Sequence, residues 1–270
     1  MTTEPINLFW TSGWDSTYRL LYLIFVVKKQ VQPIYIIEHS HRASVSVEIQ
    51  TMNQIREEIG RKDPEAAKHI LPTLYKNLQD INIDEQISEA FEKITKKQYL
   101  GGQYVYLASF AKEFKFKEVE MSIIKQGNIF NLLSPVIEEF KQEGLKNYHV
   151  AGNFRDSEIF EVFGYFSFPV IYNSKTEIRE LAVNYGFIDI LEHSWSCHSP
   201  LPGNIPCGIC PPCCYAIEEG FAYRFPEESL KRYRKSIKRR IYSMLRDHPL
   251  LFYTARHIKG FIKGKKNIVR

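Results

Sequence analysis

Short segments typical of strands alternate with segments of helical periodicity along most of this chain. The pattern predicts strands at residues 6–10, 33–39, 69–75, 119–124, 148–152 and 168–172, and helices at residues 16–28, 44–59, 84–97, 105–114 and 174–185. Because parallel strands need long crossover connections, this order predicts an α/β fold with a parallel sheet and helices on both faces. The 270 residues are 44% hydrophobic, which is enough for a core without disulfides.

Two of the predicted helices carry end signals. Ser174 followed three residues later by Glu177 is typical of a capping box at a helix start. Gly186 is expected to end that helix, and Gly60 is expected to end the helix that begins at residue 44.

The phosphate loop, residues 11–16 (TSGWDS), directly follows the first predicted strand and opens the first predicted helix. At this edge of a parallel sheet, the free N–H groups of a helix N-terminus can bind phosphate. The hydroxyls of Thr11, Ser12 and Ser16 would add donors, and we expect Gly13 to let the backbone approach a ligand with a positive φ. Asp15 would repel phosphate unless it helps to hold Mg²⁺. A plain turn at Gly13 with Asp15 as a helix cap explains the same residues, and their spacing alone does not decide between this turn and a phosphate-binding loop.

All five cysteines lie within an 18-residue stretch that ends at Cys214. Four follow the spacing C-x9-C-x2-C-x2-C, which suits a tetrahedral zinc ion held by thiolates; they are Cys197, Cys207, Cys210 and Cys213. Gly208 would permit the tight turn between two ligands. Four protein ligands leave no open position, so the Zn²⁺ would be structural. Two alternatives remain open: a redox or incidental cysteine cluster, and Cys214 as ligand in place of Cys213.

The phosphate loop resembles the pyrophosphate-binding loop of the adenine-nucleotide α-hydrolases (PP-loop ATPases), which is written Ser-Gly-Gly-x-Asp-Ser. Thr11 and Ser12 stand at the first serine and the first glycine, Gly13 at the second glycine, and Asp15 and Ser16 at the last two positions. The resemblance implies a Rossmann-like sheet, binding of ATP with Mg²⁺, and cleavage between the α- and β-phosphates. Serine in place of the first glycine is a departure from the family.

The loop and the cysteines together resemble the 7-cyano-7-deazaguanine synthase family, over roughly residues 5–225. NSKTEIRELAVNYG is similar to that family's Lys-x-Glu-Ile segment, which implies that Lys175 lies near the nucleotide phosphates. HRASVSVE, with Arg42, resembles the segment after the second strand, and YLGGQYVYLASFA resembles a later helix, although Gly102 and Gln103 stand where Arg-Asn is usual. The family's Asp-Cys-Arg-Pro-Glu-Phe segment, which helps to hold the deazapurine, does not occur in this sequence.

The resemblance implies an ATP-dependent ligase that forms C–N bonds. It would adenylate a carboxylate, expected to be 7-carboxy-7-deazaguanine, and transfer the acyl group to an amine. Ammonia would give the amide and then the nitrile, preQ0, whereas a protein amine would give a deazaguanine–protein conjugate, as is thought for some relatives in anti-phage systems. The departures in the substrate segment and the added basic residues at the end of the sequence favour such a specialised paralogue. The resemblance implies the catalytic residues Asp15, Ser16 and Lys175, and the nucleotide-binding residues Phe9, Thr11, Ser12, Gly13, Asp15, Ser16 and Arg42.

Two other classes of protein fit parts of the sequence. A tRNA-modifying PP-loop enzyme that transfers sulfur would need a catalytic cysteine pair, yet no cysteine lies outside the zinc-spaced cluster. A non-catalytic nucleotide-binding adaptor would account for Ser12 and for the missing substrate segment.

Charge is segregated along the chain. Residues 231–270 contain fourteen Lys or Arg and one acidic residue, whereas the rest of the chain has eight more acidic than basic residues. We expect a basic helical extension, broken at Pro249, that docks an acidic protein, nucleic acid, an acidic membrane surface or the chain's own acidic body.

Three parts are therefore expected: a nucleotide-binding α/β domain at residues 1–196, a zinc knuckle with its following helix at 197–225, and the basic extension at 226–270. The family resemblance implies a homodimer. The apolar run at residues 20–27 is too short to cross a bilayer, and residues 1–7 lack the order of a secretory signal. These features predict a cytoplasmic protein without a transmembrane segment.

Overall fold

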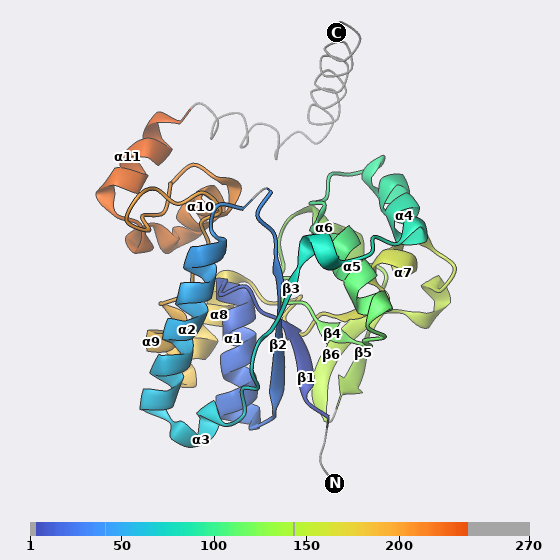
Figure 1. Ribbon diagram of the computed structural model, residues 1–270, viewed down its shortest axis with the longest axis horizontal. Helices are drawn as coiled ribbons and strands as arrows, with labels where there is room; N and C mark the ends of the chain where they lie inside the picture. Colours follow the sequence, from blue (N-terminus) through green and yellow to red (C-terminus); the bar gives the residue numbers. More distant parts are fainter. Residues whose placement is uncertain (1–3, 41, 143, 237–270) are drawn as a thin grey trace, which may run out of the picture.

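A five-stranded parallel sheet divides the molecule in the computed structural model, which describes residues 4–40, 42–142 and 144–236 (Figure 1). The strand order is β3-β2-β1-β4-β7. The strands are β1 (Ile6–Phe9), β2 (Val31–Ile37), β3 (Leu74–Asn77), β4 (Val119–Glu120) and β7 (Phe166–Ser167). The chain runs from β1 outward to β3, then returns past β1 to β4. The carboxyl end of β1 therefore lies at the switch point where α/β proteins bind ligands.

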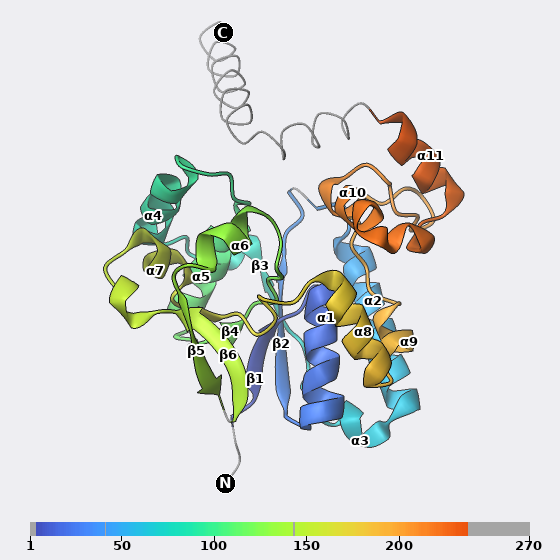
Figure 2. The same cartoon turned by 180° about the vertical axis from the view of Figure 1, so that it is seen from behind.

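Helices cover both faces of this sheet, as the alternating pattern predicts (Figures 1 and 2). One face carries α1 (Trp14–Leu21), α2 (Val45–Lys62), α3 (Pro64–Ala67), α8 (Lys175–Asn184) and α9 (Ile188–Leu191). The other face carries α4 (Glu85–Thr95), α5 (Gln103–Glu113), α6 (Gly127–Leu133) and α7 (Glu158–Phe163). A hairpin of β5 (Ile137–Gln142) and β6 (Leu145–Val150) separates α6 from α7, and α10 (Pro211–Ala216) and α11 (Glu227–Lys235) end the described chain.

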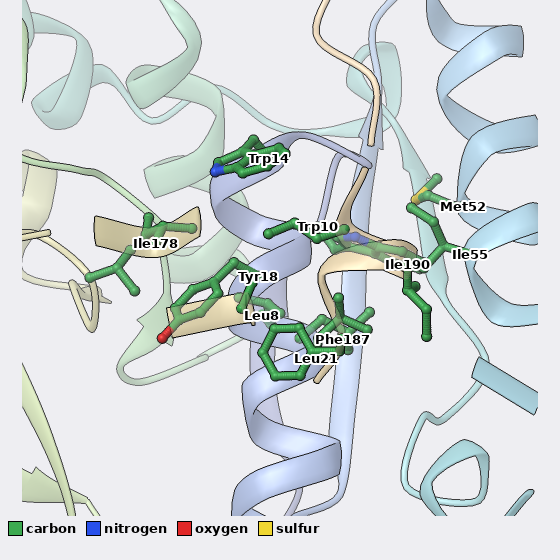
Figure 3. Packing of buried hydrophobic residues seen from close by; sticks show 14 of the residues in the cluster. Leu8, Trp10, Trp14, Tyr18, Leu21, Met52, Ile55, Ile178, Phe187 and Ile190 are labelled. Carbon is green, nitrogen blue, oxygen red and sulfur yellow. The ribbon is translucent and has the colours of Figure 1, made fainter. Parts of the chain in front are cut away.

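Successive side chains of β1 point to opposite faces of the sheet and therefore pack into two different hydrophobic cores. Leu8 and Trp10 belong to the cluster under α1 and α2, whereas Phe9 belongs to the cluster under α5 and α7. Figure 3 shows Trp14 and Tyr18 on α1, with Trp10 beside them in the first core. Trp10 is fully buried, and its indole N–H donates to the Thr17 hydroxyl at 3.0 Å, so the first strand and helix are held together next to the phosphate loop.

A buried ion pair joins the last turn of α1 to β4. Arg19 donates two hydrogen bonds to Glu120, from Nε at 2.7 Å and from Nη2 at 2.5 Å, and both residues are at most 4% exposed. Asn147 on β6 donates to Glu120 and to Ser167, each at 3.2 Å. This network ties α1, β4, β6 and β7 into one unit.

Several element boundaries differ from the sequence prediction. The helix expected to end at Gly60 continues to Lys62, because one helical glycine costs only about 1 kcal/mol, and ends before Pro64, which opens α3. The strand expected at 168–172 is wrong, since β7 ends at Ser167. The strands expected at 69–75 and 119–124 are shifted or shortened to β3 and β4.

Other local predictions are confirmed. The capping box at Ser174 is present, and Gly186 has a φ of 75° just after α8. No helix among the described residues is both long and apolar enough to cross a membrane. The basic extension beyond residue 236, including the break expected at Pro249, lies outside the described residues.

Candidate nucleotide site and metal centre

The phosphate loop lies at the carboxyl end of β1, and its last residues form the first turn of α1. Gly13 is the N-cap residue, and no side chain caps this helix. Asp15 lies inside the first turn, so the structure contradicts its role as a helix cap. The first N–H groups of α1 are therefore left to an outside acceptor such as phosphate.

Ser12, and not Gly13, adopts the left-handed backbone conformation. Its φ is 55°, whereas Gly13 is extended with a φ of −66°. The expectation of a positive φ at Gly13 is therefore wrong, and the serine at the family's first glycine position carries a strain of roughly 1–2 kcal/mol. A Cβ at Gly13 would lie 3.3 Å from the Thr11 hydroxyl, so the loop leaves little room for a side chain at this position.

The side chain of Ser12 is an orphan. The residue is fully buried, and its Oγ has no hydrogen-bond partner in the described part of the chain. A buried hydroxyl without a partner costs about 1–3 kcal/mol, which a bound phosphate oxygen would offset. Ser16, by contrast, already donates to the Gly13 carbonyl at 3.3 Å. The orphaned hydroxyl fits a ligand at this loop better than it fits a plain turn.

Three charged groups meet beside the loop. Asp15 is partly buried, and its Oδ1 is a buried atom without a hydrogen-bond partner among the described residues. Burial raises its pKa to about 6, Lys175 counteracts this rise, and Glu219 adds to it. Lys175 is the first residue of α8, and its Nζ lies 2.7 Å from a Glu219 carboxylate oxygen. The structure thus brings Asp15 and Lys175 together, and it adds Glu219, which the sequence pattern did not indicate.

A second polar group follows β2, the neighbouring strand. Nη1 of Arg42 lies 3.5 Å from Oε2 of Glu48, which also accepts a hydrogen bond from the Tyr35 hydroxyl at 2.7 Å. Arg42 also acts on His198: burial lowers the pKa of this histidine, and the positive charge of Arg42 lowers it further. Arg42 therefore lies at the ligand edge of the sheet, already paired with a carboxylate.

Phe9, the last residue of β1, points its side chain into the hydrophobic core and not toward the phosphate loop. Its side chain is 6% exposed and packs against Phe110 and Phe166, with ring centroids 6.2 and 6.0 Å away. Only its backbone, at the end of β1, is in a position to border a bound nucleotide.

The four cysteines with zinc spacing converge into one cluster. Their sulfur atoms all lie within 4.8 Å of one another, in a group made of Cys197, Cys207, Cys210 and Cys213. Tetrahedral zinc with Zn–S bonds of about 2.3 Å requires sulfur separations of about 3.8 Å, and three of the sulfur–sulfur distances in the cluster are 3.3 to 4.0 Å. The thiols form no disulfide. The donor set and its geometry fit Zn²⁺, and Cys214 lies outside the cluster, which confirms Cys213 as the fourth member.

The turn inside this cluster has a steric requirement. Gly208 has a φ of 73°, and a Cβ there would lie 2.2 Å from the carbonyl oxygen of Ser229 in α11. Backbone N–H groups of Cys207 and Cys210 donate to sulfur atoms at 3.2 and 3.3 Å. Glycine therefore permits both the turn around the metal ligands and the close approach of α11.

The cysteine module, residues 195–235, supports the phosphate loop directly. The Trp195 N–H donates to the carbonyl of Ser12 at 2.8 Å, and the Trp195 indole donates to the carbonyl of Cys197 at 2.7 Å. Arg224 stacks over Trp14 at 4.9 Å and donates to the Ser194 carbonyl at 2.6 Å. These contacts join residues far apart in sequence, so spacing could not indicate them, although Trp195 precedes the first cysteine ligand closely.

A separate cavity of about 360 Å³ lies beside α1, lined in part by Tyr18, Tyr22 and Tyr185. None of the phosphate-loop residues, Lys175 or the cysteines lines it. The assignment of the nucleotide site therefore depends on the chemistry of the loop and not on this cavity.

Comparison with known proteins agrees with this geometry. A search of curated proteins found no match to the chain. Residues 7–223 match the model of a family described as queuosine biosynthesis protein QueC, and this range includes the phosphate loop, Lys175 and the four clustered cysteines. The enzymes of this family are ATP-dependent 7-cyano-7-deazaguanine synthases, which are ligases. Since the match covers most of its length, the chain belongs to the QueC family.

Proposed function

We propose that the chain adenylates the carboxylate of 7-carboxy-7-deazaguanine with ATP and transfers the acyl group to ammonia, giving the amide and then the nitrile, preQ0. The observation that carries the proposal is the uncapped N-terminus of α1 with the buried, unpartnered Ser12 hydroxyl beside it, within a chain of the QueC family. A loop that only turned the chain would gain nothing from these unsatisfied groups.

The proposed chemistry has two adenylation steps. A carboxylate oxygen attacks the α-phosphorus of ATP, the bond to the β-phosphate oxygen breaks, and pyrophosphate leaves. Ammonia then attacks the acyl carbon, AMP leaves, and a proton is lost to give the amide. A second ATP adenylates the amide oxygen, after which loss of AMP and two protons gives the nitrile.

The chain's own residues have separate proposed roles. N–H groups of the first turn of α1 and the hydroxyls of Ser12 and Ser16 hold pyrophosphate. Lys175 stabilises the charge that develops on the α-phosphate, and preorganised donors of this kind account for most of the catalysis in phosphoryl and nucleotidyl transfer. The buried, unpartnered oxygen of Asp15 fits a Mg²⁺ that accompanies the phosphates. The cysteine cluster holds Zn²⁺ in a structural role, since no ligand position is open.

A protein amine is a second candidate acceptor. It is favoured by one observation: the Asp-Cys-Arg-Pro-Glu-Phe segment that helps the family hold the deazapurine is missing. A chain with an altered substrate segment is what a specialised, anti-phage paralogue would need. The same adenylate would then be attacked by the amine of a protein, and the product would be an amide-linked conjugate.

The test is ATP–pyrophosphate exchange with 7-carboxy-7-deazaguanine, followed by mass spectrometry of the products with ammonia. We expect exchange that depends on this carboxylate, and loss of at least tenfold in rate for Lys175→Met. Lys68→Met, which removes an exposed lysine paired with Glu65 on the opposite end of the sheet, is the matched control and should retain the parent rate. No exchange with this carboxylate would reject the ligase, and the amide with no nitrile would reject preQ0 as the product.

A further inference from the structure

Lys175 lies where a cation alone is unfavourable. It is the first residue of α8, and the partial positive charge of a helix N-terminus repels an ammonium group. The capping box between Ser174 and Glu177 fixes this helix start, so the lysine backbone cannot move away. The side chain is 18% exposed and therefore needs an anion close by.

Glu219 supplies that anion. Its Oε2 lies 2.7 Å from Lys175 Nζ, and its other carboxylate oxygen accepts a hydrogen bond from the Gln126 side chain. Glu219 belongs to a π-helical turn, Ile217–Phe221, in which Gly220 has a φ of 93°. The carboxylate is thus held between the cysteine module, α8 and the segment after β4.

The same carboxylate conflicts with a bound nucleotide. Glu219 and Asp15 act on each other as like charges, and a triphosphate at the loop would add several negative charges to the same place. The Lys175 ammonium group can form a close ion pair with only one partner, either the Glu219 carboxylate or a phosphate. Mg²⁺ would accompany the phosphates and offset part of their charge, whereas Glu219 has no such counter-ion.

We infer that Glu219 is a positioning residue that holds Lys175 when no nucleotide is bound and releases it to the phosphates when nucleotide binds. This inference rests on the proposed role of Lys175 at the phosphates. Nucleotide affinity is then set by a competition between the Glu219 carboxylate and the phosphates for one ammonium group, and the cysteine module tunes the affinity of the phosphate loop through this contact.

Isothermal titration of the full-length protein with inorganic pyrophosphate, without the carboxylate substrate, tests the competition. We expect Glu219→Gln to bind pyrophosphate about fivefold more tightly, because the competing ion pair is lost. Adenosine, which has no phosphate, should bind with unchanged affinity. Glu180→Gln removes the same charge from an exposed position on α8 and should leave both affinities unchanged.

A double-mutant cycle separates release of the lysine from simple charge repulsion. In a Lys175→Met background, Glu219→Gln should give no further gain in pyrophosphate affinity. A gain that persists without the lysine, or a loss of affinity in Glu219→Gln, would overturn the inference. If Lys175→Met itself leaves pyrophosphate affinity unchanged, the proposed role of the lysine fails instead, and the two failures are thereby distinguished.

Glu219→Asp guards against a folding defect. This variant keeps the charge but withdraws the carboxylate by one methylene group, and we expect an affinity between those of the parent and Glu219→Gln. Thermal unfolding of each variant, measured alongside, reports whether the fold is retained. An affinity for Glu219→Asp equal to or weaker than that of the parent would contradict the competition.

Discussion

Replacement of Ser12 by glycine should stabilise the fold while it weakens nucleotide binding. Glycine removes the cost of a positive φ, roughly 1–2 kcal/mol, and with it a buried, unpartnered hydroxyl that costs about 1–3 kcal/mol. Glycine has greater conformational freedom in the unfolded chain, which lowers the stability of the variant by about 0.5–1 kcal/mol. The expected net gain is about 2 kcal/mol, which corresponds to a rise in Tm of about 5 °C for a domain of this size.

The matched variant is Ser12→Ala, which removes the hydroxyl but keeps the side-chain Cβ at φ 55°. Urea unfolding should therefore place the alanine variant about 1 kcal/mol below the glycine variant in stability. Both variants lack the hydroxyl, so both should bind pyrophosphate at least tenfold more weakly, as expected for one hydrogen bond to a charged group.

Two results would refute this reasoning. Equal stability of the glycine and alanine variants would show that the backbone at Ser12 carries no strain. Unchanged pyrophosphate affinity in both would show that the hydroxyl does not face the phosphates, and the orphaned group would then need another explanation.

Three further predictions concern the charged and metal-binding groups. Asp15→Asn should unfold like the parent below about pH 4 and be up to about 3 kcal/mol more stable than the parent above about pH 6. The parent loses this stability between the two values, because its carboxyl has a pKa of about 6 in the folded chain and ionises more readily in the unfolded chain; equal urea curves at pH 7.5 would contradict this. We expect elemental analysis to find zinc in the parent and in Cys214→Ser but not in Cys210→Ser, and the opposite pattern would reassign the ligands. Arg19→Met should lower the free energy of unfolding by about 3–5 kcal/mol, since it leaves the Glu120 carboxylate buried and unpaired, and a loss below 1 kcal/mol would show that the pair is dispensable.

The features that sequence predicts well are those written in local spacing. The strand at residues 6–10, the capping box at Ser174 and the cysteine intervals each depend on neighbours within a few residues, and each appears as expected. The order of elements also gives the parallel sheet, since crossover connections leave few alternatives.

The features that prediction from the sequence misses depend on contacts between residues far apart in the chain. The prediction of a strand at 168–172 follows β-branched and aromatic letters, but Pro169 has no N–H for the ladder, and β7 ends at Ser167. Gly13 attracts the prediction of a positive φ because glycine adopts it at no cost, yet the contact of the Ser12 carbonyl with the Trp195 N–H accompanies that conformation at the serine. Glu219 carries no motif, and only the folded chain brings it to Lys175.

The hydrogen bond between Trp195 and Ser12 has a consequence for the order in which the chain can mature during synthesis. The loop residue leaves the ribosome early, and its partner follows 183 positions later, about 10 to 40 s at ordinary translation rates. Through that interval the nascent strand and helix can form, but the phosphate loop lacks the donor that contacts its strained residue. If the loop binds nucleotide as proposed, we therefore expect partly synthesised chains to bind ATP more weakly than the complete protein, until the cysteine segment has been made and folded.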